Sequence, residues 1–300
     1  MYPSRACCWR CFVRKFIDRS LPFVLALAGF LVVQAQAQKP PALPDLLKLA
    51  GDYAVQYAKQ LGAVAADEEF MQYETSSGRM GTPKRVNSVV VLLGQDDGTV
   101  GSFRDVVAID SVAVRPKDDR LAALFKRPSV ESLGTAQEMT EDAVKAYINP
   151  SLHILDRPLL AIDQLRGENQ ANYTYKTEGN KTVDGAQTVV VKYSEKGKGH
   201  LMKNASAVGR YWIEPTTGAV HQLELGFSVS NANIQSTVKF TKDAQLGILV
   251  PSELSETIDT SAAGGGMGDM GGATGSNQMS AHGAYEGRAS YAKYRRAGGS

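Results

Sequence analysis

The chain has 300 residues, of which 43% are hydrophobic and 21% charged, with a formal net charge of +2 at pH 7. Residues 1–37 hold five of the 33 basic residues and one of the 31 acidic ones, so 28 basic and 30 acidic residues remain beyond them, a charge of −2. This balance excludes a strongly basic surface, and we expect no nucleic-acid partner. About 260 residues are enough for one large β-rich domain, which we favour over two small ones.

Residues 1–37 have the organisation of a secretory signal peptide. Basic residues precede a short apolar run, Leu21 to Val33, and Ala35-Gln36-Ala37 supplies a small-x-small cleavage site. The apolar run is shorter than the ~20 residues of a comfortable membrane span. We therefore expect an exported chain, periplasmic or extracellular, that begins at Gln38 and has no stable membrane span; an uncleaved anchor is the alternative. All three cysteines precede the apolar run, so no disulfide is expected in the mature chain.

The first half of the mature chain mixes helices and strands. A helix is predicted over 45–65, because Asp45 is a suitable N-cap and apolar residues recur after it at steps of three and four. Strands are predicted over 67–73, 86–93 and 100–114. A helical insert over 119–165 follows, with a short helix at its start, a polar helix over 135–148 and helical turns over 152–165.

Strands dominate the second half, and the clearest element there is a hairpin from Gly209 to Val229. Pro215 suits the first central position of a type I turn, and Gly218 suits a closing position that needs φ > 0. The return strand alternates apolar and polar residues, which is typical of a half-buried antiparallel strand. Further strands are predicted over 171–177, 188–193, 234–241, 246–257 and 287–294, with polar loops over 178–185 and 196–206 and a disordered Gly/Met-rich loop over 262–283.

No motif in the sequence specifies an enzyme. There is no His-Glu-x-x-His, no Gly-x-Ser-x-Gly elbow and no phosphate or dinucleotide loop. The adjacent acid pairs Glu68-Glu69, Asp96-Asp97 and Asp118-Asp119 fit a helix exit, a turn and an N-cap. We expect no cofactor and a non-catalytic protein. Two alternatives stay open: a hydrolase with a site assembled from distant residues, and copper handling through soft ligands in the Gly/Met-rich loop. The candidate copper ligands are Met267, Met270, Met279 and His282.

Several segments resemble known families. VAADEEFMQ at 64–72, FRDV at 103–106, DRLAALF at 119–125 and WIEPTTG at 212–218 occur in this order, and together they resemble an uncharacterised family of exported bacterial proteins. The hairpin and the alternating strands after it also look like the second half of outer-membrane lipoprotein carriers (LolA/LolB-like). The resemblance implies an antiparallel half-barrel whose concave, apolar face is lined by helices.

The predicted fold is α+β: a curved antiparallel half-barrel sheet of roughly nine strands, with an N-terminal helix and the helical insert packed on it. The predicted function is an exported binding or carrier module for an acyl chain, a lipid or a lipoprotein. Its ligand-binding residues would line one apolar face of the sheet, which is either a filled core or an open groove. They are Val189, Val191, Tyr193, Leu223, Leu225, Phe227 and Val229.

Overall fold

The computed structural model describes residues 40–297, except 77–78, 96, 149–158, 160, 198, 202, 204, 230–231 and 261–283. The predicted signal segment and the predicted Gly/Met-rich loop therefore lie outside the described residues.

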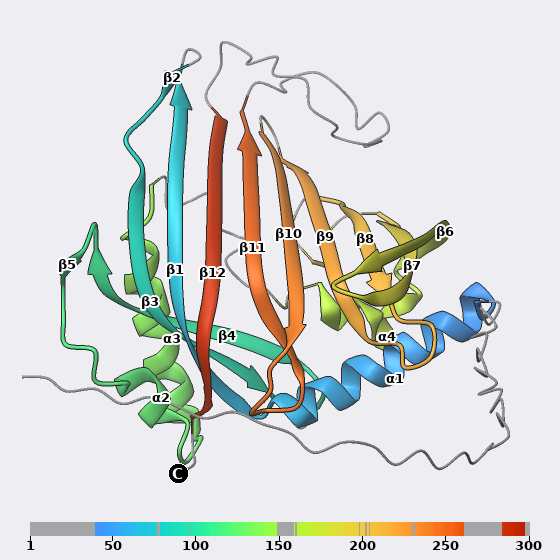
Figure 1. Cartoon of the computed structure of the whole chain (residues 1–300), viewed down its shortest axis with the longest axis horizontal. Coiled ribbons are helices and arrows are strands. Elements are labelled where there is room, and N and C mark those ends of the chain that lie inside the picture. The colour runs from blue at the N-terminus through green and yellow to red at the C-terminus, as the bar shows by residue number, and fades with distance from the viewer. Residues whose placement is uncertain are drawn as a thin grey trace, which may run out of the picture. The chain divides into compact units, whose positions relative to one another are not determined.

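All described strands belong to one antiparallel sheet (Figure 1). Along the sheet the strands follow the order β5-β4-β3-β1-β12-β11-β10-β9-β8-β7-β6, and β2 pairs with β1 outside this path. The strand β12, at the C-terminal end, thus lies between β1 and β11. Strands 1 to 6 are Ala63–Ser76, Arg79–Met80, Lys84–Gly94, Val100–Ile109, Val112–Ala113 and Tyr173–Val183. Strands 7 to 12 are Ala186–Glu195, Ala207–Ile213, Val220–Val229, Ala232–Lys242, Leu249–Asp259 and Ala284–Arg296.

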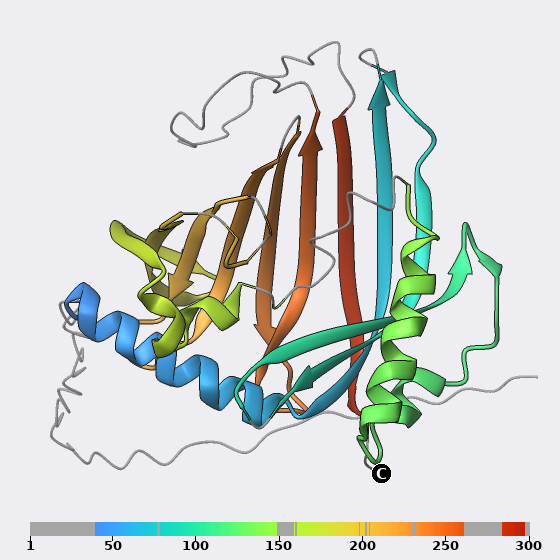
Figure 2. The same cartoon turned by 180° about the vertical axis from the view of Figure 1, so that it is seen from behind.

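The helices α1, α3 and α4 lie in front of the sheet in Figure 2. The described helices are α1 (Leu43–Leu61), α2 (Arg120–Leu124), α3 (Val130–Val144), the 3-10 helix η2 (Ile162–Leu165) and α4 (Gly167–Gln170). This arrangement confirms the predicted fold class, a curved antiparallel sheet with an N-terminal helix and a helical insert. Within the described residues, no helix is both long and apolar enough to cross a membrane.

Three glycines let the backbone of α1 approach its neighbours closely. A Cβ atom added to Gly94, at the end of β3, would lie 1.8 Å from the carbonyl oxygen of Ala58 in α1. Gly218, in the turn between β8 and β9, has φ +76°, and a Cβ atom added to it would lie 2.3 Å from the carbonyl oxygen of Leu49 in α1. Gly51, in α1 itself, faces the carbonyl of Leu165 in η2. The helix is therefore held between β3, the β8–β9 turn and η2, at a distance that larger residues would not allow.

Several predicted boundaries were wrong, each for a local reason. The first helix ends at Leu61 and not at 65, because Gly62 adopts φ +53° and the next residues pair with β3. The loop predicted over 178–185 is instead the second half of β6 and its turn into β7. The two strands are joined by Asp184 and Gly185, both at positive φ, as a two-residue hairpin turn requires. The strand predicted to reach 114 turns back at Asp110 and Ser111 for the same reason.

The helix predicted over 135–148 was also misplaced, because it begins earlier, at Val130. Ser129 caps it: the Ser129 hydroxyl accepts a hydrogen bond from the backbone N–H of Ser132, and the Ser132 hydroxyl accepts one from Ser129 N–H. A serine at the third helical position in place of the usual glutamate or glutamine conceals this capping box in the sequence.

Ion pairs attach the segment between β5 and α2 to the sheet. The Asp105 carboxylate, on β4, accepts hydrogen bonds from Arg115 at 2.9 Å and from Arg120 at 2.8 Å. Asp67, on β1, lies 2.5 Å from Lys117 and 3.4 Å from Arg295 of β12. Asp119, at the start of α2, also pairs with Arg295, so the segment is attached to the C-terminal strand β12 as well as to β1 and β4.

We predict that Gly94→Ala lowers the free energy of unfolding by about 1–3 kcal/mol, because the new methyl group forces α1 away from β3. Gly134→Ala is the matched control. Gly134 is exposed on α3 and nothing lies within 4 Å of an added Cβ, so this change should be neutral or stabilising by up to about 1 kcal/mol. Urea unfolding measures both; equal losses for the two variants would contradict the docking of α1 on Gly94.

We predict a pH-dependent contribution to stability from Asp67. Burial alone would raise the pKa of Asp67, but the hydrogen bond and charge of Lys117, with Lys293 and Arg295, hold it below its usual value. A carboxyl whose pKa is lowered on folding stabilises the protein above its unfolded pKa of about 3.9, and that contribution is lost as the pH falls through the folded value.

Asp67→Asn should therefore be less stable than the natural chain near neutral pH, and the difference should narrow as the pH falls below about 4. Thermal unfolding at a series of pH values measures this difference. Glu138→Gln, an exposed change on α3, controls for the loss of one negative charge. A difference for Asp67→Asn that stays constant down to acid pH would refute the predicted shift.

Candidate functional site

The structure places six of the seven predicted ligand-binding residues on one face of the sheet, inside the core. Val189, Val191 and Tyr193 lie on β7, and Leu223, Leu225 and Phe227 lie on β9. Each of the six is at most 4% exposed. Val229 ends β9, and its side chain lies outside the described residues. The structure thus brings the six together in one buried face, which we call the apolar wall.

The apolar wall extends well beyond the predicted residues. Strand register aligns residues of neighbouring strands in rows, because side chains on one face recur at every second position. One row is apolar along its whole length: Val191, Tyr211, Leu223, Val238, Leu254, Ala289, Phe70 and Val86. It runs from β7 to β3, about 34 Å at about 4.8 Å between neighbouring strands.

Described parts of α1 and η2 pack onto this wall. Leu46, Ala50 and Tyr57 of α1 and Ile162 of η2 belong to the same buried cluster as the wall residues. The ring of Tyr211 stacks on Tyr193 at 4.6 Å between ring centroids. The Tyr211 hydroxyl donates a hydrogen bond to the carbonyl of Ala161 at 2.8 Å. In this structure the wall is therefore part of the hydrophobic core.

A buried ion pair interrupts the apolar face on β1 and β4. Arg104 donates two hydrogen bonds to Glu68, from Nε to Oε2 and from Nη2 to Oε1, both 2.6 Å long. The Glu68 side chain is fully buried and that of Arg104 is 3% exposed. The guanidinium also lies 5.9 Å from the centroid of the Tyr147 ring. Because the fork of Arg104 matches both carboxylate oxygens, the two charges neutralise each other inside the core.

The charge of Glu68 also influences the tyrosines beside it. Burial raises the pKa of Tyr291 well above its usual value, and the negative charge of Glu68 raises it further. Burial and the same carboxylate raise the pKa of Tyr294. Both phenols therefore stay protonated at any physiological pH, and neither is a candidate general base.

Gln72, two positions beyond Phe70 on the same face of β1, anchors the chain that follows α3. Its side-chain oxygen accepts hydrogen bonds from the backbone N–H of Ile148 at 2.7 Å and from the Tyr285 hydroxyl at 3.3 Å. Tyr147 packs edge-on against Phe70, with 5.3 Å between the ring centroids. These contacts hold the end of α3 against β1.

The sequence does not predict the ion pair, although part of its signal is present there. Together with Glu69, Glu68 forms an adjacent acid pair for which the sequence favours a helix exit. Its position in the alternation of Ala66, Glu68 and Phe70 places it on the apolar face. The identity of its partner could not be read, because Glu68 and Arg104 are 36 residues apart and meet only through the β1–β3–β4 register.

The predicted metal ligands Met267, Met270, Met279 and His282 lie outside the described residues, so copper binding stays untested. In the described part of the chain, no group of three or more His, Cys, Asp or Glu side chains could hold a metal ion. His221 faces Glu214 at 3.7 Å across the base of the β8–β9 hairpin, which is a structural contact.

No family model matches the chain, and no curated protein sequence matches it either. Solved structures do match. A DUF1329 family protein from Desulfovibrio piger is 13% identical, with 83% of this chain and 92% of that chain covered and a TM-score of 0.36. A LolA superfamily protein from Nitrosomonas europaea is 10% identical, with 82% and 92% covered and a TM-score of 0.31. The chain is thus distantly similar in structure to these proteins, as the sequence resemblance predicted.

We predict that Arg104→Leu lowers the free energy of unfolding by about 3–5 kcal/mol, because it leaves the Glu68 carboxylate buried and unpaired. The double change Glu68→Leu with Arg104→Leu removes both charges and should recover part of the loss. Lys48→Met is the control, since Lys48 and Asp52 form an exposed pair at 3.9 Å that should contribute less than about 1 kcal/mol. If Arg104→Leu unfolds at the same denaturant concentration as Lys48→Met, the pair is not the buried contact described above.

Proposed function

We propose that the protein is an exported, non-catalytic binding or carrier module of the cell envelope. The ligand would be an apolar molecule, namely an acyl chain, a lipid or the lipid portion of a lipoprotein, bound against the apolar wall. The observation that carries the proposal is the unbroken apolar row from Val191 to Val86, which crosses most of the sheet.

The size of the wall supports an elongated ligand. The row is about 34 Å long, which is longer than a compact side-chain pocket. It takes one side chain from each of eight neighbouring strands of the sheet. A ligand lying along the row would contact one side chain from each strand. Apolar contact of this kind has no directional preference and suits a flexible hydrocarbon chain.

The polar groups on the same face support binding rather than catalysis. Glu68 and Arg104 are neutralised by each other, and the hydroxyls of Tyr291 and Tyr294 remain protonated. A general acid–base reaction needs a group that exchanges a proton near neutral pH and reaches its substrate. The Glu68 carboxylate is instead held by Arg104, and the Glu195 carboxylate, on the same face of β7, accepts hydrogen bonds from the backbone N–H groups of His200 and Ala207.

The buried state of the wall sets a condition on binding. An acyl chain must displace side chains that now cover the wall, and each buried CH₂ group contributes only about 0.8 kcal/mol. Short chains therefore cannot offset the displaced packing, whereas long chains can. Affinity should therefore rise steeply with the length of the acyl chain. Binding to an open surface would not need a minimum chain length, because no side chains would have to be displaced.

We predict that a photoreactive long-chain fatty acid, irradiated with the exported protein, labels the apolar wall. Mass spectrometry of the digested protein should find the label on peptides that carry Leu223, Leu225 or Phe227, and a photoreactive octanoic acid should give little labelling. Unlabelled palmitic acid should compete. Labels confined to Gln222 and Glu224, on the opposite face of the same strand, or labelling independent of chain length, would contradict the proposal.

Lipids extracted from the protein as purified from cells give a second measurement. We expect co-purified lipid and saturable binding of a fluorescent fatty acid. If both are absent, a structural or partner-binding role is the better account.

A further inference from the structure

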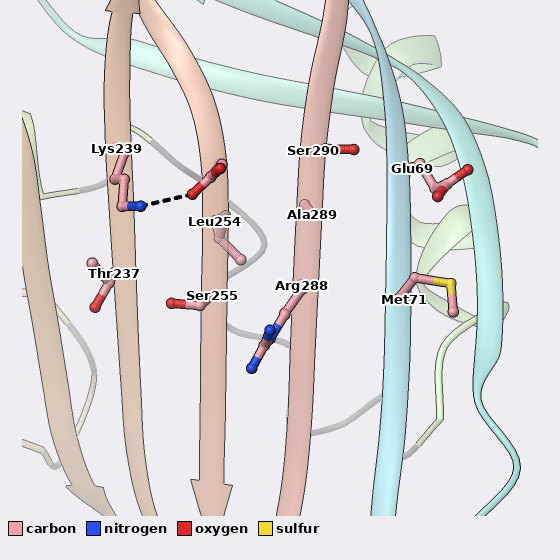
Figure 3. Close-up of a pocket in the computed structure, with 10 residues that line it drawn as sticks. Glu69, Met71, Thr237, Lys239, Leu254, Ser255, Arg288, Ala289 and Ser290 are labelled. Atoms are coloured by element: carbon pink, nitrogen blue, oxygen red, sulfur yellow. Dashed lines mark hydrogen bonds and ion pairs between the residues drawn. The ribbon is translucent and has the colours of Figure 1, made fainter. Parts of the chain in front are cut away.

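A trough of about 450 Å³ lies on the face of the sheet opposite the apolar wall (Figure 3). It crosses β10, β11, β12 and β1, and its position does not depend on the proposed function. The volume falls in the range of small-molecule sites, which is about 300–1,000 Å³. Its polar lining comes from side chains that alternate with the buried ones: Glu69, Thr237, Lys239, Glu253, Ser255, Arg288 and Ser290.

The negative charges of the trough are already paired. Glu253 accepts a hydrogen bond from Lys239 at 2.9 Å, and Glu69 lies 3.7 Å from Arg85 of β3. Arg85 also donates to the sulfur of Met71 at 3.3 Å. Each carboxylate thus has a cation beside it, which leaves the paired groups close to neutral.

Arg288 is the exception. Within the described ranges its side chain makes no hydrogen bond or ion pair, and it is exposed. Figure 3 shows it extending from β12 towards β11, away from Met71 and Glu69. A guanidinium carries five N–H donors in a planar fork, so the trough presents one uncompensated positive charge with its donors available.

Hydroxyl groups lie near this charge on the two strands next to β12 on the β11 side. Ser255 of β11 is directly opposite Arg288 in the strand register, and Thr237 of β10 is directly opposite Ser255. Ser290, two residues along β12, points towards β1 and away from the guanidinium (Figure 3). Directly opposite side chains have Cβ atoms about 4.5–5.5 Å apart. A single functional group of a ligand can therefore contact the guanidinium and a neighbouring hydroxyl at the same time.

We propose that this trough is an anion site that binds a phosphate group through Arg288, with hydrogen bonds from Thr237 and Ser255. A tetrahedral phosphate offers acceptor oxygens both in the plane of the guanidinium fork and outside it, which matches a fork flanked by hydroxyls. Further along the same row, Glu224 lies opposite Thr237 and pairs with Arg210 at 3.2 Å, so this carboxylate also has a cation beside it. The phosphate would be a free phosphate or the head group of a lipid, and the two sources share this chemistry.

The test is a calorimetric titration of the full exported protein with inorganic phosphate in chloride buffer. We expect saturable binding that weakens at least about tenfold in Arg288→Gln, because bidentate charge-assisted hydrogen bonds are lost. Arg288→Lys keeps the positive charge but not the guanidinium fork, so its affinity for phosphate should lie between that of the natural chain and that of Arg288→Gln. Arg127→Gln, an exposed change in the loop between α2 and α3, is the matched control and should bind as the natural chain does.

Vesicles separate the two sources. Binding to phosphatidylglycerol vesicles, absent with phosphatidylcholine and lost in Arg288→Gln, assigns the site to a lipid head group. Phosphate binding without vesicle binding assigns it to a free phosphate. The proposal is overturned if neither probe binds, or if a folded Arg288→Gln, checked by its thermal unfolding, binds both as the natural chain does.

Discussion

The pairing of β12 between β1 and β11 holds the sheet together. Without it, β1 to β5 would form one small sheet and β6 to β11 another, because no other described pairing joins the two groups. In β12, Tyr291 is opposite Glu68 of β1 and Ala289 is opposite Leu254 of β11. The apolar wall is therefore continuous only because β12 lies between β1 and β11. Each row of side chains that crosses the sheet depends on its register.

The twofold alternation of a strand gives this sheet two chemically different faces. On one face most residues are apolar and buried, and the charged ones there include the Glu68–Arg104 pair, Glu195 and Glu256. On the other face, rows of charged and hydroxyl-bearing residues line an open trough. The two proposals concern opposite faces of the same strands, so a ligand on one face would not compete directly with a ligand on the other.

Much of the fold could be predicted from local sequence. The alternation of Leu223, Leu225 and Phe227 correctly identified the buried face of β9, and Gly218 does adopt the positive φ that its turn position requires. The turn at Asp184 and Gly185 was readable as well, since Asp-Gly is a preferred dipeptide for a two-residue hairpin, but the polar residues around it favoured a loop.

What could not be predicted depends on contacts between residues far apart in the chain. The pairing of β12 with β1 joins residues more than 200 positions apart, as the 213 between Gln72 and Tyr285 illustrates, and no local pattern encodes it. The same holds for the trough. In the sequence, these polar positions look like any others of amphipathic strands. Only the strand register places Arg288, Ser255 and Thr237 next to one another.

The edge strand β6 has a consequence for self-association. A sheet that is not closed leaves two strands with unpaired backbone groups, and such strands can recruit a strand from another copy. One edge here is β5, which has only two residues. The other is β6, which carries Lys176 and Lys181 and a bulge between Thr177 and Gly179 that breaks the regular spacing of its donors and acceptors. Both edge strands of this wide sheet are therefore poor templates for the addition of strands from other copies and for fibril growth.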